Sequence, residues 1–180
     1  MNYWKIDTED VCNGDGLRVV LWLSGCNHQC YNCQNPQTWD PNSGILFDKS
    51  AKERIFRELN KEYISGLTLS GGDPLYELNL DGVLDLITEI NKRYKMSKNK
   101  TIWLYTGYEW EQLFNDKTHF VAGCSEWKRR EIVKKCDVLV DGKFIKELKN
   151  TNLIFRGSSN QRIIDINKTK EKGKIVIWER

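Results

Sequence analysis

Residues 17–33 read LRVVLWLSGCNHQCYNC and contain both an apolar run and a cluster of cysteines. The first seven residues are almost continuously apolar, which is typical of a β-strand covered on both faces. Three cysteines follow the strand directly: Cys26, Cys30 and Cys33 are separated by three and then by two residues. Gly25 and Pro36 flank them and favour a loop over a helix. The stretch therefore predicts a buried strand that ends in a loop carrying three thiols.

Apolar strands and amphipathic helices alternate outward from this stretch. A capping-box pair, Ser50 and Glu53, is expected to open the first helix, and Ser125 is expected to cap the third. Residues 162–166 and 174–178 predict two more strands around a lysine-rich turn, as a C-terminal strand-turn-strand extension. The other predicted elements are strands at 17–23, 64–69, 101–105 and 137–140, and helices at 50–59, 80–90 and 125–135.

This alternation predicts an α/β fold with parallel strands joined by right-handed crossovers. A complete eight-stranded barrel needs about 250 residues, whereas this chain has 180. We therefore expect one domain, residues 1–180, built as a partial, open TIM-type β/α barrel with its helices outside.

An unusual motif follows each of the four predicted central strands. The carboxyl ends of parallel strands meet at one edge of a sheet, where active sites form. These motifs are therefore expected to converge on one site. They are the cysteine loop, Ser70-Gly71-Gly72-Asp73-Pro74, Thr106-Gly107-Tyr108 and Asp141-Gly142-Lys143-Phe144.

Composition excludes several classes of protein. The net charge is only +3, which is too small a bias to indicate a nucleic-acid partner. No apolar run is long enough to span a membrane, and the first residues lack the pattern of a signal peptide. We therefore expect a cytoplasmic protein with no membrane partner. Thiols stay reduced in that compartment, so six cysteines need an explanation other than disulfides.

Three thiolates in one short loop suit a [4Fe-4S] cluster that keeps one iron open for a ligand. The alternative is a structural zinc ion with Cys12 or His28 as the fourth ligand, although zinc sites usually show two close ligand pairs. Cys12, Cys124 and Cys136 have no ligand spacing and are expected to be ordinary thiols. His28 and His119 are expected to be surface or packing residues.

The Cys-x3-Cys-x2-Cys loop resembles the signature of the radical S-adenosylmethionine (SAM) superfamily. The chain departs from the superfamily pattern at Asn32, where an aromatic residue is usual, and at Asp73, where Glu is frequent. Five segments in order resemble one subfamily, the anaerobic ribonucleoside-triphosphate reductase-activating proteins, which are glycyl-radical enzyme activases. These segments are residues 25–39, 69–75, 105–108, 138–142 and 155–161.

The resemblance implies a fold of the radical SAM class and two cofactors, a [4Fe-4S] cluster and SAM. Asp141 and Lys143 are candidates for contact with SAM or with the path of the radical, with a solvated turn as the alternative. Residues 156–160 are expected to serve SAM or the partner protein. The implied metal ligands are Cys26, Cys30 and Cys33, and the implied SAM contacts are Asn32, Cys33, Gln34, Gly71, Gly72, Asp73 and Thr106. Among these, the loop that carries Asp73 is expected at the amino group of SAM, and Thr106 at its ribose.

Arg18 lies in a segment, residues 13–18, that is similar to the Gly-x-Gly-x-Arg entry of glycyl-radical activases. Two environments are open for this side chain. It is expected either to face a carboxylate inside the barrel or to form an ion pair at the surface.

The implied reaction is reductive cleavage of SAM, followed by removal of a hydrogen atom from a backbone glycine of anaerobic ribonucleoside-triphosphate reductase. The implied partners are that reductase and a one-electron donor such as a flavodoxin. Three alternatives remain open at this point: an activase of another glycyl-radical enzyme, a radical SAM enzyme acting on a small molecule, and a zinc-stabilised binding module without catalysis.

Overall fold

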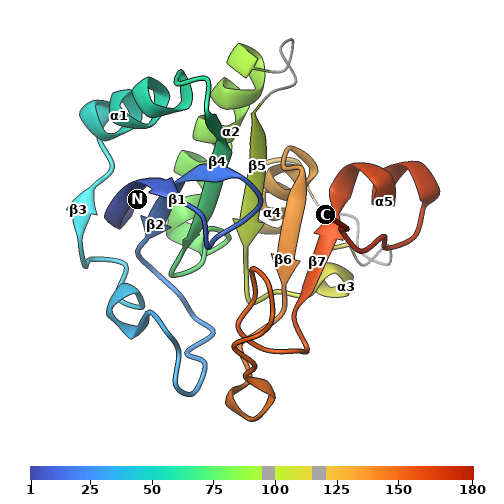
Figure 1. Cartoon of the computed structure of the whole chain (residues 1–180). Coiled ribbons are helices and arrows are strands. Elements are labelled where there is room, and N and C mark those ends of the chain that lie inside the picture. Colours follow the sequence, from blue (N-terminus) through green and yellow to red (C-terminus); the bar gives the residue numbers. More distant parts are fainter. Residues whose placement is uncertain (95–99, 115–120) are drawn as a thin grey trace.

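The computed structural model describes residues 1–94, 100–114 and 121–180. His119 lies outside these residues. The described chain forms one seven-stranded sheet in the order β3-β1-β2-β4-β5-β6-β7, open at both edges (Figure 1). The strands are β1 (Asn2–Asp10), β2 (Leu17–Leu23), β3 (Ile45–Leu46), β4 (Ile64–Gly71), β5 (Thr101–Tyr105), β6 (Val138–Asp141) and β7 (Arg162–Asp165).

The predicted parallel strands are confirmed for the centre of the sheet and wrong for its edges. β2, β4, β5 and β6 pair in parallel. β1 and β3 add antiparallel strands at one edge, and β7 is antiparallel to β6 at the other. β1 was not predicted, because its sequence, NYWKIDTED, mixes charged with aromatic residues and does not form an apolar run.

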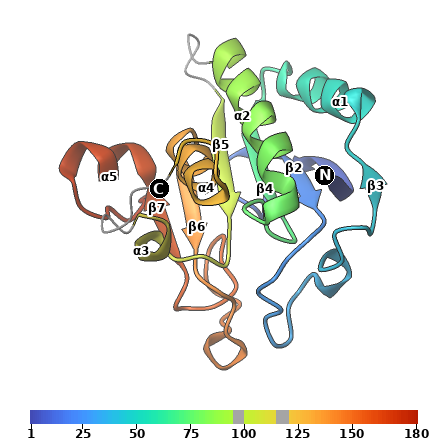
Figure 2. The ribbon, with the colours of Figure 1, turned by 180° about the vertical axis from the view of Figure 1, so that it is seen from behind.

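Helices α1 (Lys49–Leu59), α2 (Leu80–Tyr94) and α4 (Ser125–Lys134) cover one face of the sheet, as the view from behind shows (Figure 2). Leu80, Val83, Ile87 and Ile90 of α2 are buried, as the helical spacing predicts, whereas Leu84 of the same pattern is half-buried. The short α3 (Trp110–Leu113) and α5 (Ile166–Lys172) lie toward the β7 edge. Single-turn 3-10 segments span Pro36–Thr38, Glu77–Asn79 and Lys146–Leu148.

Two helix starts differ from the prediction by one or two residues. The Asp48 side chain, rather than Ser50, caps α1 and accepts the backbone N–H of Ala51 at 2.9 Å. Cys124, rather than Ser125, precedes α4, and its Sγ accepts the N–H of Trp127 at 3.4 Å. Both caps satisfy N–H groups that a helix start leaves without partners.

The C-terminal extension is a strand followed by a helix, not a strand-turn-strand unit. Asp165 accepts the N–H of Lys168 at 2.9 Å and so starts α5 where a turn was expected. Gly173 ends the helix in the left-handed conformation. Residues 174–178 form no strand, although Ile177 makes a single bridge to Ile164.

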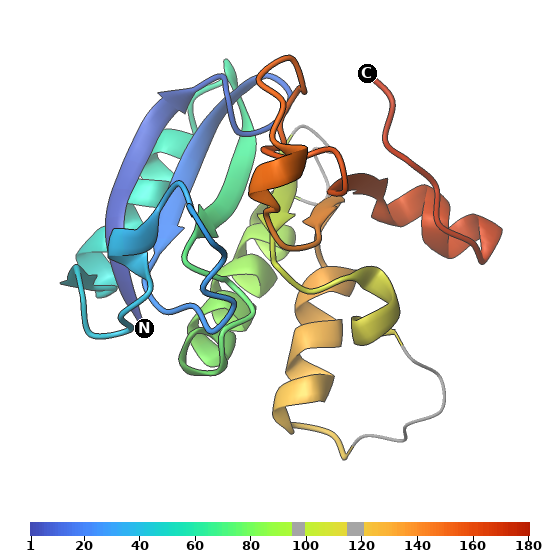
Figure 3. The ribbon, with the colours of Figure 1, turned by 90° about the horizontal axis from the view of Figure 1, so that it is seen from below.

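The carboxyl ends of the four central strands point to the same edge of the sheet, the lower edge in Figure 1. Seen from below, the loop after β2 and the loop after β6 lie on opposite sides of this edge, with the loop after β4 beside the first (Figure 3). None of the helices that the structure describes is long and apolar enough to cross a lipid bilayer.

Candidate active site

The cysteine loop after β2 is closed at its base by its own backbone. The N–H of Gly25 donates to Thr38 O at 2.7 Å, and the N–H of Cys26 donates to Trp39 O at 3.1 Å. Inside the loop, the N–H of Cys33 donates to Cys30 O at 3.0 Å. The first two of these bonds join the start of the loop to its end. Residues 25–39 therefore form a closed loop, which we call the cysteine ring.

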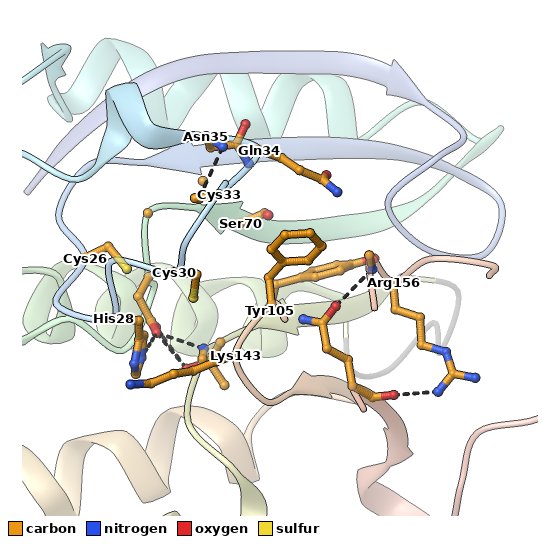
Figure 4. A pocket seen from close by; sticks show the side chains of 18 of the residues that line it. Cys26, His28, Cys30, Cys33, Gln34, Asn35, Ser70, Tyr105, Lys143 and Arg156 are labelled. Carbon is orange, nitrogen blue, oxygen red and sulfur yellow. Dashed lines mark hydrogen bonds and ion pairs between the residues drawn. The ribbon is translucent and has the colours of Figure 1, made fainter. Parts of the chain in front are cut away.

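The three thiols of this ring line a cavity of about 420 Å³ at the edge of the sheet. Figure 4 shows Cys26, Cys30 and Cys33 gathered at one side of the cavity, across from Tyr105 and Arg156. Residues from the loops after β4, β5 and β6 also line it, among them Gly72, Thr106 and Lys143. The predicted convergence of the four motifs on one site is therefore confirmed.

Burial opposes the thiolate form of two cysteines in the ring, Cys26 and Cys30. Burial raises the pKa of Cys26 to about 11, although the N–H groups of His28 and Gln29 act in the opposite direction. Burial also raises the pKa of Cys30, against the effect of the Phe144 N–H and the Lys143 charge. The free thiols of Cys26 and Cys30 are therefore protonated at neutral pH, and a bound metal would displace their protons.

The arrangement of the thiols fits a cluster better than a single ion. Among the residues that the structure describes, no three His, Cys, Asp or Glu side chains converge closely enough to hold one metal ion. A four-iron cubane binds each thiolate at a different iron, so its ligands surround a volume and do not meet at a point. Cys26, Cys30 and Cys33 line a cavity together, as the ligands of such a cluster do.

Gln34, Gly71 and Gly72 line the cavity, as expected of SAM contacts. Asn32 is exposed on the ring, in the left-handed conformation with φ 55°, and is not part of the cavity wall. Its predicted contact with SAM has no support in this geometry, because the ring turns the residue outward.

Asp73 and Thr106 lie in the cavity wall, but their polar atoms are bonded to the protein. Thr106 Oγ1 lies 2.9 and 3.0 Å from the two oxygens of Asp73 and accepts the N–H of Tyr108 at 3.2 Å. Asp73 is 1% exposed and also contacts His28, with 2.7 Å between Nε2 and Oδ2. The predicted roles of Asp73 at the SAM amino group and of Thr106 at the ribose would need these bonds to be replaced.

The two weaker candidates, Asp141 and Lys143, have different positions. Lys143 is exposed and lines the cavity near Cys30. Asp141 is fully buried outside the cavity lining, where its carboxylate accepts hydrogen bonds from Arg162 and from the Trp110 N–H. The geometry of Asp141 is that of a structural anchor for the end of β6.

Neither expected environment of Arg18 is correct. The side chain is fully buried, and its hydrogen bonds within the described part of the chain all go to neutral oxygens. It donates to Thr68 Oγ1 at 2.7 Å, to Leu67 O at 2.8 Å and to Thr101 O at 2.8 Å. Burial lowers its pKa to about 10, so it remains charged at neutral pH.

Sequence reasoning missed two contributions to the site. His28 is not a simple packing residue, because it joins the cysteine ring to Asp73; its position between two cluster cysteines was the available signal. Cys12 and Asn13, from the segment between β1 and β2, line the cavity as well, and nothing in their spacing indicates this.

In the segment 156–160, which was expected to serve SAM or the partner protein, Arg156 and Gly157 line the cavity, while Ser158 Oγ accepts the N–H of Ile145.

The sequence is similar to those of known iron–sulfur proteins. The profile of a family described as "4Fe-4S single cluster domain" matches residues 12–164. The anaerobic ribonucleoside-triphosphate reductase-activating protein of Enterobacteria phage T4 is 40% identical over 163 residues, which cover 91% of this chain and 93% of that protein.

The proteins of the same name from Haemophilus influenzae and Escherichia coli K12 are each 39% identical. The first match covers 91% of this chain and 97% of the relative, and the second covers 89% and 96%. The family profile spans the cysteine ring and the four central strands. The chain therefore belongs to the family of anaerobic ribonucleoside-triphosphate reductase-activating proteins, whose domain binds a single [4Fe-4S] cluster.

Proposed function

We propose that this chain activates an anaerobic ribonucleoside-triphosphate reductase by generating a glycyl radical on it. The observation that carries the proposal is the closed ring that presents Cys26, Cys30 and Cys33 to one cavity. The name shared by its relatives points to the same partner.

When bound, a reduced cluster with one open iron supplies the electron that cleaves the carbon–sulfur bond of SAM. Each activation consumes one electron and one SAM, removes one hydrogen atom from the glycine, and releases methionine and 5′-deoxyadenosine. The electron comes from a one-electron donor, for which a flavodoxin is suitable. A reduced, cytoplasmic environment suits a site that depends on free thiols, and all six cysteines are free.

The residues of this chain hold and shield the reactants. Cys26, Cys30 and Cys33 hold the cluster, while Gln34 and the backbone of Gly71 and Gly72 contact SAM beside it. Phe144 and Phe155 add apolar surface to the cavity wall, which keeps water from a reactive intermediate. Lys143, exposed at the same cavity, is a candidate for contact with SAM.

We interpret the open sheet as a partial β/α barrel of the radical SAM class. Its edge strands are β3 and β7, so the barrel is not closed by strand pairing. A barrel with a missing side leaves room for a peptide loop of the reductase, which would itself cover the reactants. This interpretation favours a protein substrate over a small molecule.

The test combines the anaerobically reduced protein, SAM and the reductase, and follows the products by electron paramagnetic resonance. We expect a glycyl radical signal on the reductase. Deuterium placed at that glycine should appear in 5′-deoxyadenosine. Transfer of deuterium from a small metabolite, with none from the reductase, would refute the proposed substrate, and stoichiometric zinc without iron uptake would refute the chemistry.

A further inference from the structure

The Asp73 carboxylate is the meeting point of three loops. It lies in the loop after β4, where its Oδ1 accepts the N–H of Leu75 at 2.7 Å. From the loop after β5, the hydroxyl of Thr106 donates to it and the N–H of Gly107 donates at 3.1 Å. From the cysteine ring, His28 Nε2 approaches Oδ2 at 2.7 Å.

This carboxylate has little capacity left for a ligand. An ionised carboxylate offers about four acceptor sites, and Leu75, Thr106, Gly107 and His28 already supply donors to both oxygens. The backbone carbonyl of Asp73 is also engaged, because it accepts the Asn79 side chain at 3.0 Å and the Tyr76 N–H at 2.9 Å.

His28 is held tightly on the other side of this contact. Its ring packs edge-on against Tyr108, with 4.7 Å between the ring centroids. A Cβ atom added to Gly107 would lie 2.4 Å from the His28 ring, so the backbone of the β5 loop also touches it. The imidazole therefore fits between Asp73 and the β5 loop, and the cysteine ring moves only if these contacts break.

We propose that Asp73 is a positioning residue that locks the cysteine ring to the loops after β4 and β5 through His28, and that its side chain does not bind the amino group of SAM. The inference rests on the proposed function in one respect. In that function, SAM binds the cluster on the cysteine ring and the backbone of Gly72 on the β4 loop at the same time. Their relative position therefore decides whether SAM binds productively. A buried carboxylate joined to a histidine supplies a charge-assisted bond between the two, which is stronger than a neutral one.

The test measures amide hydrogen exchange across residues 25–39 in the chain purified without air, together with SAM binding where the cluster is present. Asp73→Asn keeps the shape of the side chain but turns an NH2 group toward other donors, and His28→Ala removes the link. We expect each variant to speed exchange in the ring by about tenfold to a hundredfold, as for loss of a charge-assisted bond. The double variant should exchange no faster than either single one, because both remove the same contact.

Two further variants separate a bond from general damage. Thr106→Ser keeps the hydroxyl and should behave like the parent, whereas Thr106→Val removes it and should loosen the ring. Asp81→Asn is the matched control, since the Asp81 side chain is 81% exposed and pairs with Lys128 at the surface; ring exchange should not change.

Unchanged ring exchange in both Asp73→Asn and His28→Ala would overturn the inference. So would weaker SAM binding in Asp73→Asn with normal ring exchange and normal SAM binding in His28→Ala, because that pattern indicates a direct contact between Asp73 and SAM. A parent chain that takes up no iron would refute the proposed function instead, and the exchange measurement would still decide the role of Asp73.

Discussion

Gly72 shows how closely the β4 loop and the cysteine ring are packed. A Cβ atom at this position would lie 2.4 Å from Gly25 O and 2.9 Å from Thr38 O. Both are backbone atoms at the base of the ring, and backbone cannot rotate away as a long side chain can. The missing side chain therefore makes room for the ring itself, in addition to exposing backbone to the cavity.

The first prediction is that Gly72→Ala impairs assembly of the cluster as well as binding of SAM. Overpacking of this kind costs about 1–3 kcal/mol, and here the strain falls on the bonds that close the ring. Iron and sulfide content after anaerobic reconstitution measures the effect. Gly82→Ala is the control, because the three atoms nearest to its added Cβ belong to the flexible Met1 side chain; normal iron content in both variants would contradict the prediction.

The second prediction concerns which thiols bind the cluster. Cys30→Ala should abolish the [4Fe-4S] absorption and electron paramagnetic resonance signals, because the ring has no spare thiol. Cys12→Ala should retain them, although Cys12 also lines the cavity. Complete loss of iron in Cys12→Ala would mean that four thiolates close the cluster, which would leave no open iron for SAM.

At the level of elements, Arg162 at the start of β7 joins three parts of the fold. It donates to both oxygens of Glu111 on α3, at 2.8 and 2.7 Å, and to Asp141 at the end of β6. Asp141 in turn accepts the N–H of Trp110 at 2.8 Å, at the first residue of α3. These bonds form a clamp of Arg162, Glu111 and Asp141. The clamp fixes the point where the chain leaves β6 and enters the loop that lines the cavity.

The third prediction is that this clamp weakens in acid. The two bonds from Arg162 lower the pKa of Glu111 from 4.5 to about 2. A carboxylate whose pKa is lowered by folding stabilises the protein above its unfolded pKa, and this stabilisation is lost as the pH falls from about 4.5 toward 2. The difference in free energy of unfolding between the parent and Glu111→Gln should therefore be larger at pH 6 than at pH 3, as measured by urea denaturation.

Because the Glu111 side chain is 56% exposed, its pair with Arg162 should also respond to salt. The difference between the parent and Glu111→Gln at pH 6 should decrease in 1 M salt, a concentration at which the screening length is about 3 Å. A difference that depends on neither pH nor salt would show that the pair contributes nothing to stability.

At the level of the whole molecule, Arg18 connects the first segment of the chain to the middle of the sheet. Its guanidinium joins β2 to β4 through Thr68 and Leu67, and to β5 through Thr101. It also donates to Asp15 O at 3.0 Å and lies 5.5 Å from the Trp103 ring. One buried side chain thus holds the segment before β2, which contributes Cys12 and Asn13 to the cavity, against the central strands.

The fourth prediction is that Arg18→Met destabilises the apo protein by about 3 kcal/mol or more, since it leaves several buried acceptors without donors. The free energy of unfolding in urea measures this loss. Arg57→Met is the control, because the Arg57 side chain is 70% exposed. Equal stability of the two variants would mean that the Arg18 bonds only offset the cost of burying its charge.

The sequence alone predicts the spacing of Cys26, Cys30 and Cys33, the apolar run 17–23, and the order of the four central strands with α1, α2 and α4 between them, because these are local properties. It also determined that four motifs meet at one edge, because parallel strands place their carboxyl ends together. The resemblance to a family rests on the same local motifs, which is why it survived comparison with the relatives.

The partners of the buried polar groups, in contrast, follow from the three-dimensional arrangement of the chain. Asp73 looked like a ligand-binding carboxylate and Arg18 like one half of an ion pair, yet each is satisfied by atoms far along the chain. The edge strand β1 likewise depends on pairing with β2 and β3, not on an apolar run of its own. A hydrogen bond between distant segments forms only after the sheet has brought them together. Such a bond leaves no pattern in the sequence near either residue, so it cannot be predicted from local sequence.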